Sequence, residues 1–237
     1  MAEDLSLLLE NFSITEEEDA EVTIPIGEFQ EVVSYGKNCV VPKLVADRLI
    51  SMEVIKATLR RWWKLHGKMS FKALGDNLFL IEFTNSQDKE RTLEGRPWVF
   101  EGSLFLVEDF DGITSPSDYT FDKDAFWVRM FKMPLGCMGQ AIGRRIGETV
   151  GTVEVVDTNA NGMGWGKFLR AKILMDLTKP LPRGRKINIQ GKLVWIPFQY
   201  ERLPKFCYSC GIISHDKRGC PQKSSLRQQD PQYGPWL

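Results

Sequence analysis

Four potential metal ligands lie in one short stretch near the C-terminus. They are Cys207, Cys210, His215 and Cys220, spaced as C-x2-C-x4-H-x4-C. Three thiolates and one imidazole form the soft, four-coordinate set that structural zinc prefers, and they leave no position for a catalytic water. A stretch this short cannot bury a core of its own, so metal binding and folding should be one event. The spacing therefore predicts one structural Zn²⁺.

A chance cluster of cysteines and a metal-free Cys207–Cys210 disulfide are the alternatives for this stretch. The cysteine count is five, an odd number, and the N-terminus is acidic where a signal peptide needs a basic start. Both features indicate a reducing compartment. No run of 18 apolar residues occurs, which excludes a transmembrane helix, and we expect no membrane partner. We expect a nuclear or cytoplasmic protein, with the nucleus slightly favoured, that is not secreted.

The cysteine-rich stretch resembles the CCHC zinc knuckle of retroviral nucleocapsid and retrotransposon Gag proteins. The resemblance implies that it binds single-stranded nucleic acid through exposed aromatic and basic side chains. Ser214 precedes His215 where the family usually has Gly, so a sequence preference cannot be transferred. The residues that match or extend the family's binding surface are Lys205, Phe206, Tyr208, Lys217 and Arg218.

The formal net charge is zero, but the charges are divided unevenly along the chain. Residues 1–22 carry 8 acidic residues and no basic one, whereas residues 141–237 carry 16 basic residues and 7 acidic ones. The part between them is almost neutral. The sequence therefore combines an acidic leader with a basic C-terminal half, which favours a polyanionic partner whose affinity falls with salt.

The first half of the chain predicts a ferredoxin-like, RRM-like β-α-β-β-α-β domain over residues 31–112. Period-two and helical hydrophobic patterns alternate along it, and Gly or Pro ends most segments. Pro42 should limit the first strand to a sheet edge. The expected elements are strand 40–45, helix 51–64, strand 69–74, strand 78–83, helix 86–94 and one or two strands in 98–110 that turn at Glu101–Gly102.

The strand at 78–83 argues against RNA stacking on this first sheet. Phe79, Ile81 and Phe83 share one face, which should be the core face because the helix at 51–64 is amphipathic. The other face carries Leu78, Leu80 and Glu82, which cannot stack on bases. We therefore interpret it as a degenerate motif that acts as a packing platform.

Residues 125–203 predict a second, smaller α+β unit with the same order of elements. Its second helix is missing or reduced, and its final hairpin should turn at Gln190–Gly191. The expected elements are strand 126–133, helix 139–150, strands 152–157 and 167–177, and hairpin 186–200. The whole chain divides into an acidic leader (1–30), the RRM-like domain (31–112), a linker (113–124), the second unit (125–203), the knuckle (204–221) and a disordered tail (222–237).

Two strands of the second unit carry aromatic and basic residues in alternation. In a ferredoxin-like order these strands are adjacent and central, and rings that stack on bases beside cations are typical of single-strand binding. Packing of Trp127 and Phe168 against the first domain is the alternative. The candidate residues are Trp127, Arg129 and Phe131 on one strand and Phe168, Arg170 and Lys172 on the other. A basic run that includes Arg183, Arg185 and Lys186 is a candidate phosphate contact.

The order of motifs resembles the plant domain of unknown function 4283 joined to its CCHC knuckle. The matching segments are GDNLFLIEF, RTLEGRPWVFEGSLFLVEDF, FWVRMFKMPL and LVWIPFQYERLPKFCYSCG. Such chains resemble the Gag-like protein of plant LINE-type retrotransposons or a domesticated relative. The resemblance implies an RNA-binding protein of a ribonucleoprotein particle.

We therefore predict a zinc-dependent protein that binds single-stranded nucleic acid, with RNA favoured. The alternative is a protein-interaction scaffold that binds a partner or self-associates through the degenerate sheet and the acidic leader, and keeps the knuckle as a structural remnant. Enzymatic activity and a small-molecule substrate are not expected, because the chain has only His66 and His215 as histidines. The loop GMGWGK fails the phosphate-loop pattern, since Asn161 and Phe168 stand at two of its required positions.

Overall fold

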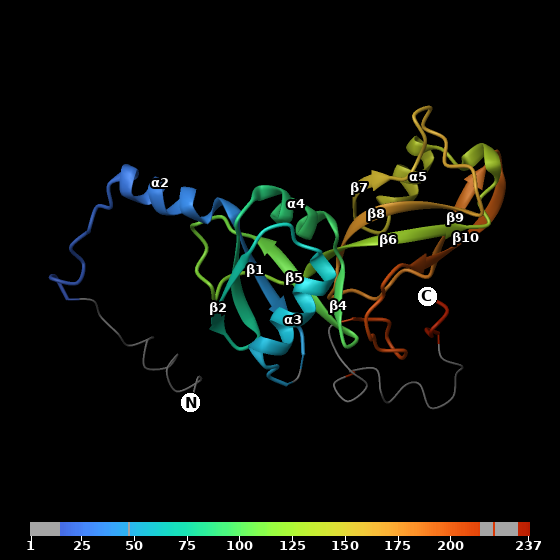
Figure 1. Cartoon of the computed structure of the whole chain (residues 1–237). Coiled ribbons are helices and arrows are strands. Elements are labelled where there is room, and N and C mark those ends of the chain that lie inside the picture. The colour runs from blue at the N-terminus through green and yellow to red at the C-terminus, as the bar shows by residue number, and fades with distance from the viewer. Residues whose placement is uncertain (1–14, 47, 214–219, 221–231) are drawn as a thin grey trace.

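The structure is a computed structural model that describes residues 15–46, 48–213, 220 and 232–237 (Figure 1). The described chain is α+β, as the sequence predicts, with two antiparallel sheets of five strands each. No helix in the described ranges has the length and apolar character needed to cross a bilayer.

The first sheet has the strand order β2-β3-β1-β5-β4, which is the ferredoxin-like order with one added edge strand. Helix α3 buries Ile55, Leu59 and Trp63, which recur at helical spacing, against this sheet. The predicted order of elements in this domain is confirmed. Their bounds are β1 Cys39–Leu44, α3 Met52–Trp63, β2 Met69–Gly75, β3 Leu78–Phe83, α4 Ser86–Glu94, β4 Trp98–Phe100 and β5 Ser103–Asp109.

The prediction that Pro42 marks an edge strand is wrong. Strand β1 lies in the middle of the sheet, between β3 and β5. Its pairs with β3 are Cys39–Glu82, Val40–Ile81 and Lys43–Leu78, so the ladder skips Val41 and Pro42. The N–H that proline lacks therefore coincides with a gap in the pairing, and on the other side Pro42 lies opposite Val107.

The second sheet has the order β7-β8-β6-β10-β9, which repeats the order of the first. Helix α5 takes the place of α3, while the described connection at 177–183 contains no helix where the first domain has α4. This confirms a second α+β unit whose second helix is missing, but with five strands of its own the unit is not smaller than the first, as the sequence predicts it to be. The bounds are β6 Lys123–Phe131, α5 Gln140–Gly147, β7 Thr152–Val156, β8 Phe168–Asp176, β9 Gly184–Ile189 and β10 Lys192–Tyr200.

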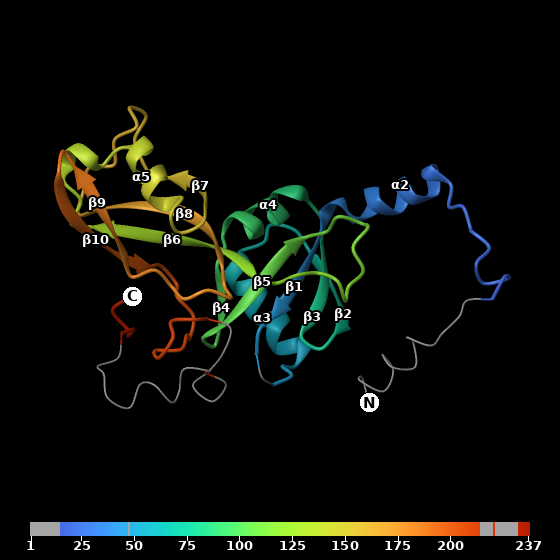
Figure 2. The same cartoon turned by 180° about the vertical axis from the view of Figure 1, so that it is seen from behind.

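Strand β5 contributes side chains to both hydrophobic cores. Phe105 and Val107 pack under α3 with the first core, whereas Leu104 and Leu106 belong to the core of the second unit. The β4 side of the first sheet lies toward the second unit in both views (Figure 2). The sheet face interpreted as a packing platform thus supplies part of the contact between the two units.

Two segments differ from the expected leader and tail. Helix α2, Ile26–Tyr35 (Figure 1), is not foreseen from the sequence. It buries none of its residues. Residues 232–237, which fall in the predicted disordered tail, pack on the second unit: Leu237 is buried, and its carbonyl accepts a 2.6 Å hydrogen bond from the Tyr200 N–H. The apolar side chain of Leu237 finds space beside β10, which local sequence does not reveal.

Candidate metal centre and nucleic-acid surface

The three cysteines of the predicted metal site lie together. The sulfur atoms of Cys207, Cys210 and Cys220 are all within 4.8 Å of one another, and all three residues are buried. A tight turn brings the first two together: the Gly211 N–H donates to the Cys207 carbonyl at 2.7 Å, and Gly211 has a φ of 80°, which favours glycine. The fourth predicted ligand, His215, lies outside the described residues.

The environment of Cys207 favours its thiolate. Burial alone would raise the pKa of this thiol, but hydrogen bonds from the backbone N–H groups of Cys210 and Ser209, and from the thiols of Cys210 and Cys220, lower the pKa to about 7. Metal ligation requires the thiolate form. The turn therefore prepares Cys207 for a metal.

The donor set fits zinc. Sulfur atoms at about 2.3 Å from a tetrahedral zinc would be roughly 3.8 Å apart, which is compatible with the observed grouping. Three thiolates with a fourth protein ligand would form a closed structural site. If bound, the ion would cross-link this turn and supply no chemistry to a substrate.

The knuckle is held by both units of the chain. The Lys205 N–H donates to the Gly102 carbonyl in the β4–β5 turn at 2.7 Å. The Leu181 N–H donates to the Gly211 carbonyl at 2.9 Å, and Phe206 packs against the second core. The knuckle is therefore part of the folded body over its described residues.

The β6–β8 face carries the predicted aromatic and basic residues as direct cross-strand pairs. Trp127 lies opposite Lys172, Arg129 opposite Arg170, and Phe131 opposite Phe168. This confirms that the two strands are adjacent and that each set of three shares a face.

Guanidinium groups and rings stack on one another across this face. The Arg170 guanidinium lies 4.4 Å from the centre of the Trp127 ring, and the Arg129 guanidinium lies 4.7 Å from that of Phe168. The rings of Phe131 and Phe168 are 5.2 Å apart. All five side chains are only partly buried. The stacking fixes their orientation and leaves part of each ring open to a ligand.

Two carboxylates that the sequence analysis missed offset the arginines. Glu201 accepts from Arg129 at 2.7 Å and from Arg170 at 3.2 Å, and Asp157 accepts from Arg170 at 2.7 Å. Partial burial would raise the pKa of Glu201, but these hydrogen bonds lower it overall. The charge of the face is therefore close to balanced. Glu201 follows the end of β10, so no pattern within β6 or β8 points to it.

Lys172 serves the contact between the two units. It is buried, its ammonium donates to the Glu94 carbonyl at the end of α4, and it lies 3.6 Å from the Glu154 carboxylate. The register brings Lys172 to the end of the face that meets the first domain, where a phosphate has no access. The prediction that Lys172 contacts nucleic acid is therefore wrong, because the side chain is buried.

The three residues of the basic run, Arg183, Arg185 and Lys186, make different contacts. Arg185 donates to the side chain and carbonyl of Thr149 after α5, at 2.9 and 2.7 Å, and so holds that helix end. Arg183 donates to Gln232 and stacks on Tyr233. Lys186 is exposed.

The aromatic residues at the knuckle lie close to each other. Phe206 and Tyr208 form an edge-to-face pair at 5.0 Å, and both Tyr208 and Lys205 are exposed. Lys217 and Arg218 lie outside the described residues.

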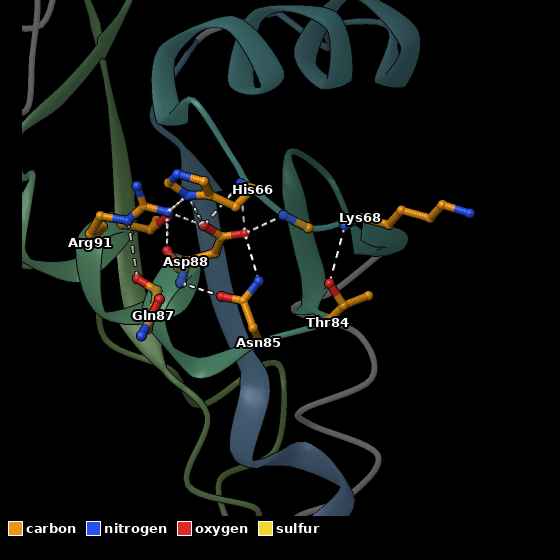
Figure 3. Close-up of polar contacts among 9 residues, drawn as sticks. His66, Lys68, Thr84, Asn85, Gln87, Asp88 and Arg91 are labelled. Carbon is orange, nitrogen blue, oxygen red and sulfur yellow. Dashed lines mark hydrogen bonds and ion pairs between the residues drawn. The ribbon is translucent and has the colours of Figure 1, made fainter.

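A polar cluster around Asp88 joins the end of α3 to the start of α4 (Figure 3). The buried Asp88 carboxylate accepts from the backbone N–H groups of His66 and Gly67, from the Asn85 side chain and from Arg91. Burial would raise the pKa of Asp88, but these donors hold it well below its usual range. His66 itself is largely exposed. The cluster is a structural tie.

The fold and the cysteine site together define a two-unit α+β protein with a cysteine-rich knuckle that follows β10. Residues 36–117 match the family described as domain of unknown function (DUF4283), and residues 175–222 match the family described as zinc knuckle. The chain thus carries a DUF4283 domain followed by a CCHC-type zinc knuckle, as the sequence resemblance implies. The zinc-knuckle match starts within β8 and includes the β9–β10 hairpin.

A similar protein is the uncharacterized protein At4g02000 of Arabidopsis thaliana. The two are 28% identical over 132 residues, which cover 55% of this chain and 41% of that protein. The chain therefore spans less than half the length of this relative.

Proposed function

We propose that this protein binds single-stranded nucleic acid, RNA in preference to DNA, and that its knuckle holds one structural Zn²⁺. The observation that carries the proposal is the stacked ladder of Trp127, Phe131 and Phe168 with Arg129 and Arg170 on the β6–β8 face. Partly open rings fixed by guanidinium groups accept any base on their π-face, and this is how sequence-tolerant single-strand binders work. Catalysis and a small-molecule substrate are no part of the proposal.

Stacking should contribute more than charge at this face. Glu201 and Asp157 offset the two arginines, so the face offers little net charge to phosphates. Phosphate contacts would come instead from exposed basic side chains outside this face, such as Lys186 and Lys205. A zinc knuckle in the same chain supports the same partner, since knuckles are a common RNA-binding module. The Gag-like resemblance supports a place in a ribonucleoprotein particle.

The test is binding of the full, zinc-loaded chain to fluorescein-labelled single-stranded oligonucleotides, measured by fluorescence anisotropy. Phe168→Ala should weaken binding about tenfold, because one base–aromatic stack is worth roughly 1–3 kcal/mol. Phe29→Ala on α2 is the matched control, since Phe29 is also a partly exposed phenylalanine but lies in the first half. An unchanged dissociation constant for Phe168→Ala would contradict the proposal, and RNA and DNA oligomers of one sequence test the preference.

Self-association is the second candidate, favoured by the unburied helix α2. Ile26, Val32 and Tyr35 of this helix are exposed, and a groove of about 520 Å³ beside it is lined by Leu80 and Phe110. A protein-interaction scaffold would use this surface. Sedimentation equilibrium of the wild type and of Val32→Asp tests it: a concentration-dependent dimer that Val32→Asp abolishes supports the scaffold, and a monomer at all concentrations argues against it.

A further inference from the structure

A groove of about 620 Å³ crosses the second sheet at β10, and we call it the β10 groove. It is lined by Phe131 and Lys132 at the end of β6, by Trp195 and Gln199 of β10, and by Arg183 and Trp236. Four of the lining residues, Lys132, Trp195, Gln199 and Trp236, are not among those that the sequence predicts to bind nucleic acid.

The groove depends on the segment 232–237. One edge of β10 bonds to β6, as the Glu201 N–H donates to the Trp127 carbonyl. Along the other edge, the Tyr200 N–H donates to the Leu237 carbonyl and the Phe198 N–H donates to the Arg183 carbonyl. Residues 236–237 thus continue the line of β9 along β10. This places Trp236 on the side of β10 opposite to Phe131.

The lining has the composition of a single-strand binding site. Trp195 and Trp236 are 48% and 54% exposed, so each ring has a face open to a planar ligand. None of the ten lining side chains in the described chain is acidic, whereas those of Lys132 and Arg183 are cationic. Arg183 bonds to the neutral Gln232 and stacks on the neutral Tyr233, so these contacts do not offset its charge. The side chains that line the groove therefore carry a net positive charge, which those of the β6–β8 face lack.

Phe131 connects the groove to the β6–β8 face. Its ring packs on Phe168 within the stacked set of Trp127, Phe131, Phe168, Arg129 and Arg170, which we call the aromatic ladder. The same ring also lines the groove. The parity of β10 places Trp195 and Gln199 on the same side of the sheet as Arg129, because Gln199 lies opposite Arg129. A strand bound on the ladder can therefore continue into the groove without crossing the sheet.

We propose that the β10 groove is a second stacking subsite for single-stranded nucleic acid, with bases against Trp195 and Trp236 and phosphates on Lys132 and Arg183. This rests on the proposed function and names where the strand continues and which residues hold its phosphates. The segment 232–237 is then an element of the binding site as well as a structural one.

The experiment compares oligouridylates of increasing length on the full, zinc-loaded chain by fluorescence anisotropy. Trp236→Ala should weaken the binding of long oligomers about tenfold and leave short ones, which occupy the ladder alone, unchanged. Lys132→Gln should lower the slope of log Kd against log salt by about 0.7, the value for one lost phosphate contact on a single strand. Circular dichroism checks that each variant is folded.

Leu193→Ala and Lys192→Gln are the matched controls. Both residues are exposed on β10 near Trp195 but outside the groove, and both variants should bind like the wild type. If Phe168→Ala weakens binding while Trp236→Ala and Lys132→Gln do not at any length, the groove proposal fails and the proposed function stands. If the wild type binds no oligonucleotide, both fail.

Discussion

The Arg170 guanidinium lies 4.4 Å from the centre of the Trp127 ring while it also bonds to Asp157 and Glu201. The same group is thus held by a ring on one side and by two carboxylates at its edge. This arrangement keeps the aromatic ladder rigid before any ligand arrives, which lowers the entropy lost on binding. It also means that the carboxylates limit how much charge the face presents.

Removing one of these carboxylates should strengthen nucleic-acid binding. Glu201→Gln keeps the size of the side chain but leaves Arg129 and Arg170 with one carboxylate between them. We expect affinity for single strands to rise several-fold and the salt slope to steepen by about 0.7, as one more phosphate is contacted. Anisotropy titrations at several salt concentrations measure both. Glu148→Gln, at an exposed site after α5, should change neither the affinity nor the salt slope. If Glu201→Gln binds single strands more weakly than the wild type, the prediction is wrong and Glu201 instead holds the aromatic and arginine side chains in their binding geometry.

Loss of the metal should destabilise the whole second unit. Cys207→Ser or a chelator would release Phe206 and the Leu181–Gly211 hydrogen bond from their present contacts. Loss of about 2 kcal/mol of side-chain burial lowers the melting temperature by roughly 4–8 °C in a chain of this size. Calorimetry and a zinc assay measure these effects, with one zinc per wild-type chain expected. Ser209→Ala changes the same turn without removing a ligand, so this variant should retain both the bound zinc and the wild-type melting temperature. If zinc-free Cys207→Ser melts at the wild-type temperature, the knuckle does not stabilise the second unit and the prediction is wrong.

Asp88 should make the first domain sensitive to acid. The pKa of this carboxylate is lower in the folded state than in the unfolded state. Its contribution to the free energy of unfolding is therefore fully present above the unfolded-state pKa of about 3.9, and it is lost as the pH falls through the folded-state pKa. Asp88→Asn should therefore cost about 2–3 kcal/mol at pH 7, the worth of hydrogen bonds to a charge, and less near pH 2. Urea unfolding at both pH values tests this. Asp76→Asn in the exposed β2–β3 turn is the control. If Asp88→Asn loses the same free energy of unfolding at both pH values, the ionised Asp88 carboxylate is not the source of the stability.

Asp124 should have the opposite effect on the pH dependence of stability, because its charged form destabilises the fold. It is 1% exposed, its Oδ2 has no hydrogen-bond partner in the described structure, and burial raises its pKa to about 7. Because the folded form holds the proton more tightly, stability falls as the pH rises from about 4 to about 7. Asp124→Asn should thus be more stable than the wild type at pH 8, by about 2–4 kcal/mol, and equal to it near pH 4.

Denaturant unfolding of Asp124→Asn and of the wild type at the two pH values measures this difference in stability. The exposed Asp122→Asn serves as the neighbouring control and should show no such dependence. A variant less stable than the wild type at pH 8 would mean that the Asp124 charge is stabilising, through Arg96 and Lys172.

Much of the fold could be predicted because its signals are local. The alternation in LFLIEF predicts β3 with its bounds, and α4 runs from Ser86 to Glu94 as expected because Asn85 caps it by accepting from the Asp88 N–H. The cysteine spacing likewise predicts a cluster that the structure brings together. The edge assignment of Pro42 fails because the position of a strand in a sheet depends on partners far away in sequence.

The candidate surface could be predicted only in part, for the same reason. Period two places Arg129 and Arg170 on one face, but not the carboxylate of Glu201 that joins them. Nor does any local pattern show that Lys172 meets Glu94 of the other unit, or that Trp236 lies beside β10. These relations arise from tertiary packing, so no short window of sequence contains them.

Strand β5 has a consequence for how the molecule unfolds. Phe105 anchors one core while Leu104 and Leu106 complete the other, so separating the two units strips apolar surface from a strand they share. Melting should therefore be cooperative across both units, in a single transition. A fragment ending before β6 would expose Leu104 and Leu106 on a sheet face, and would tend to aggregate where the full chain does not.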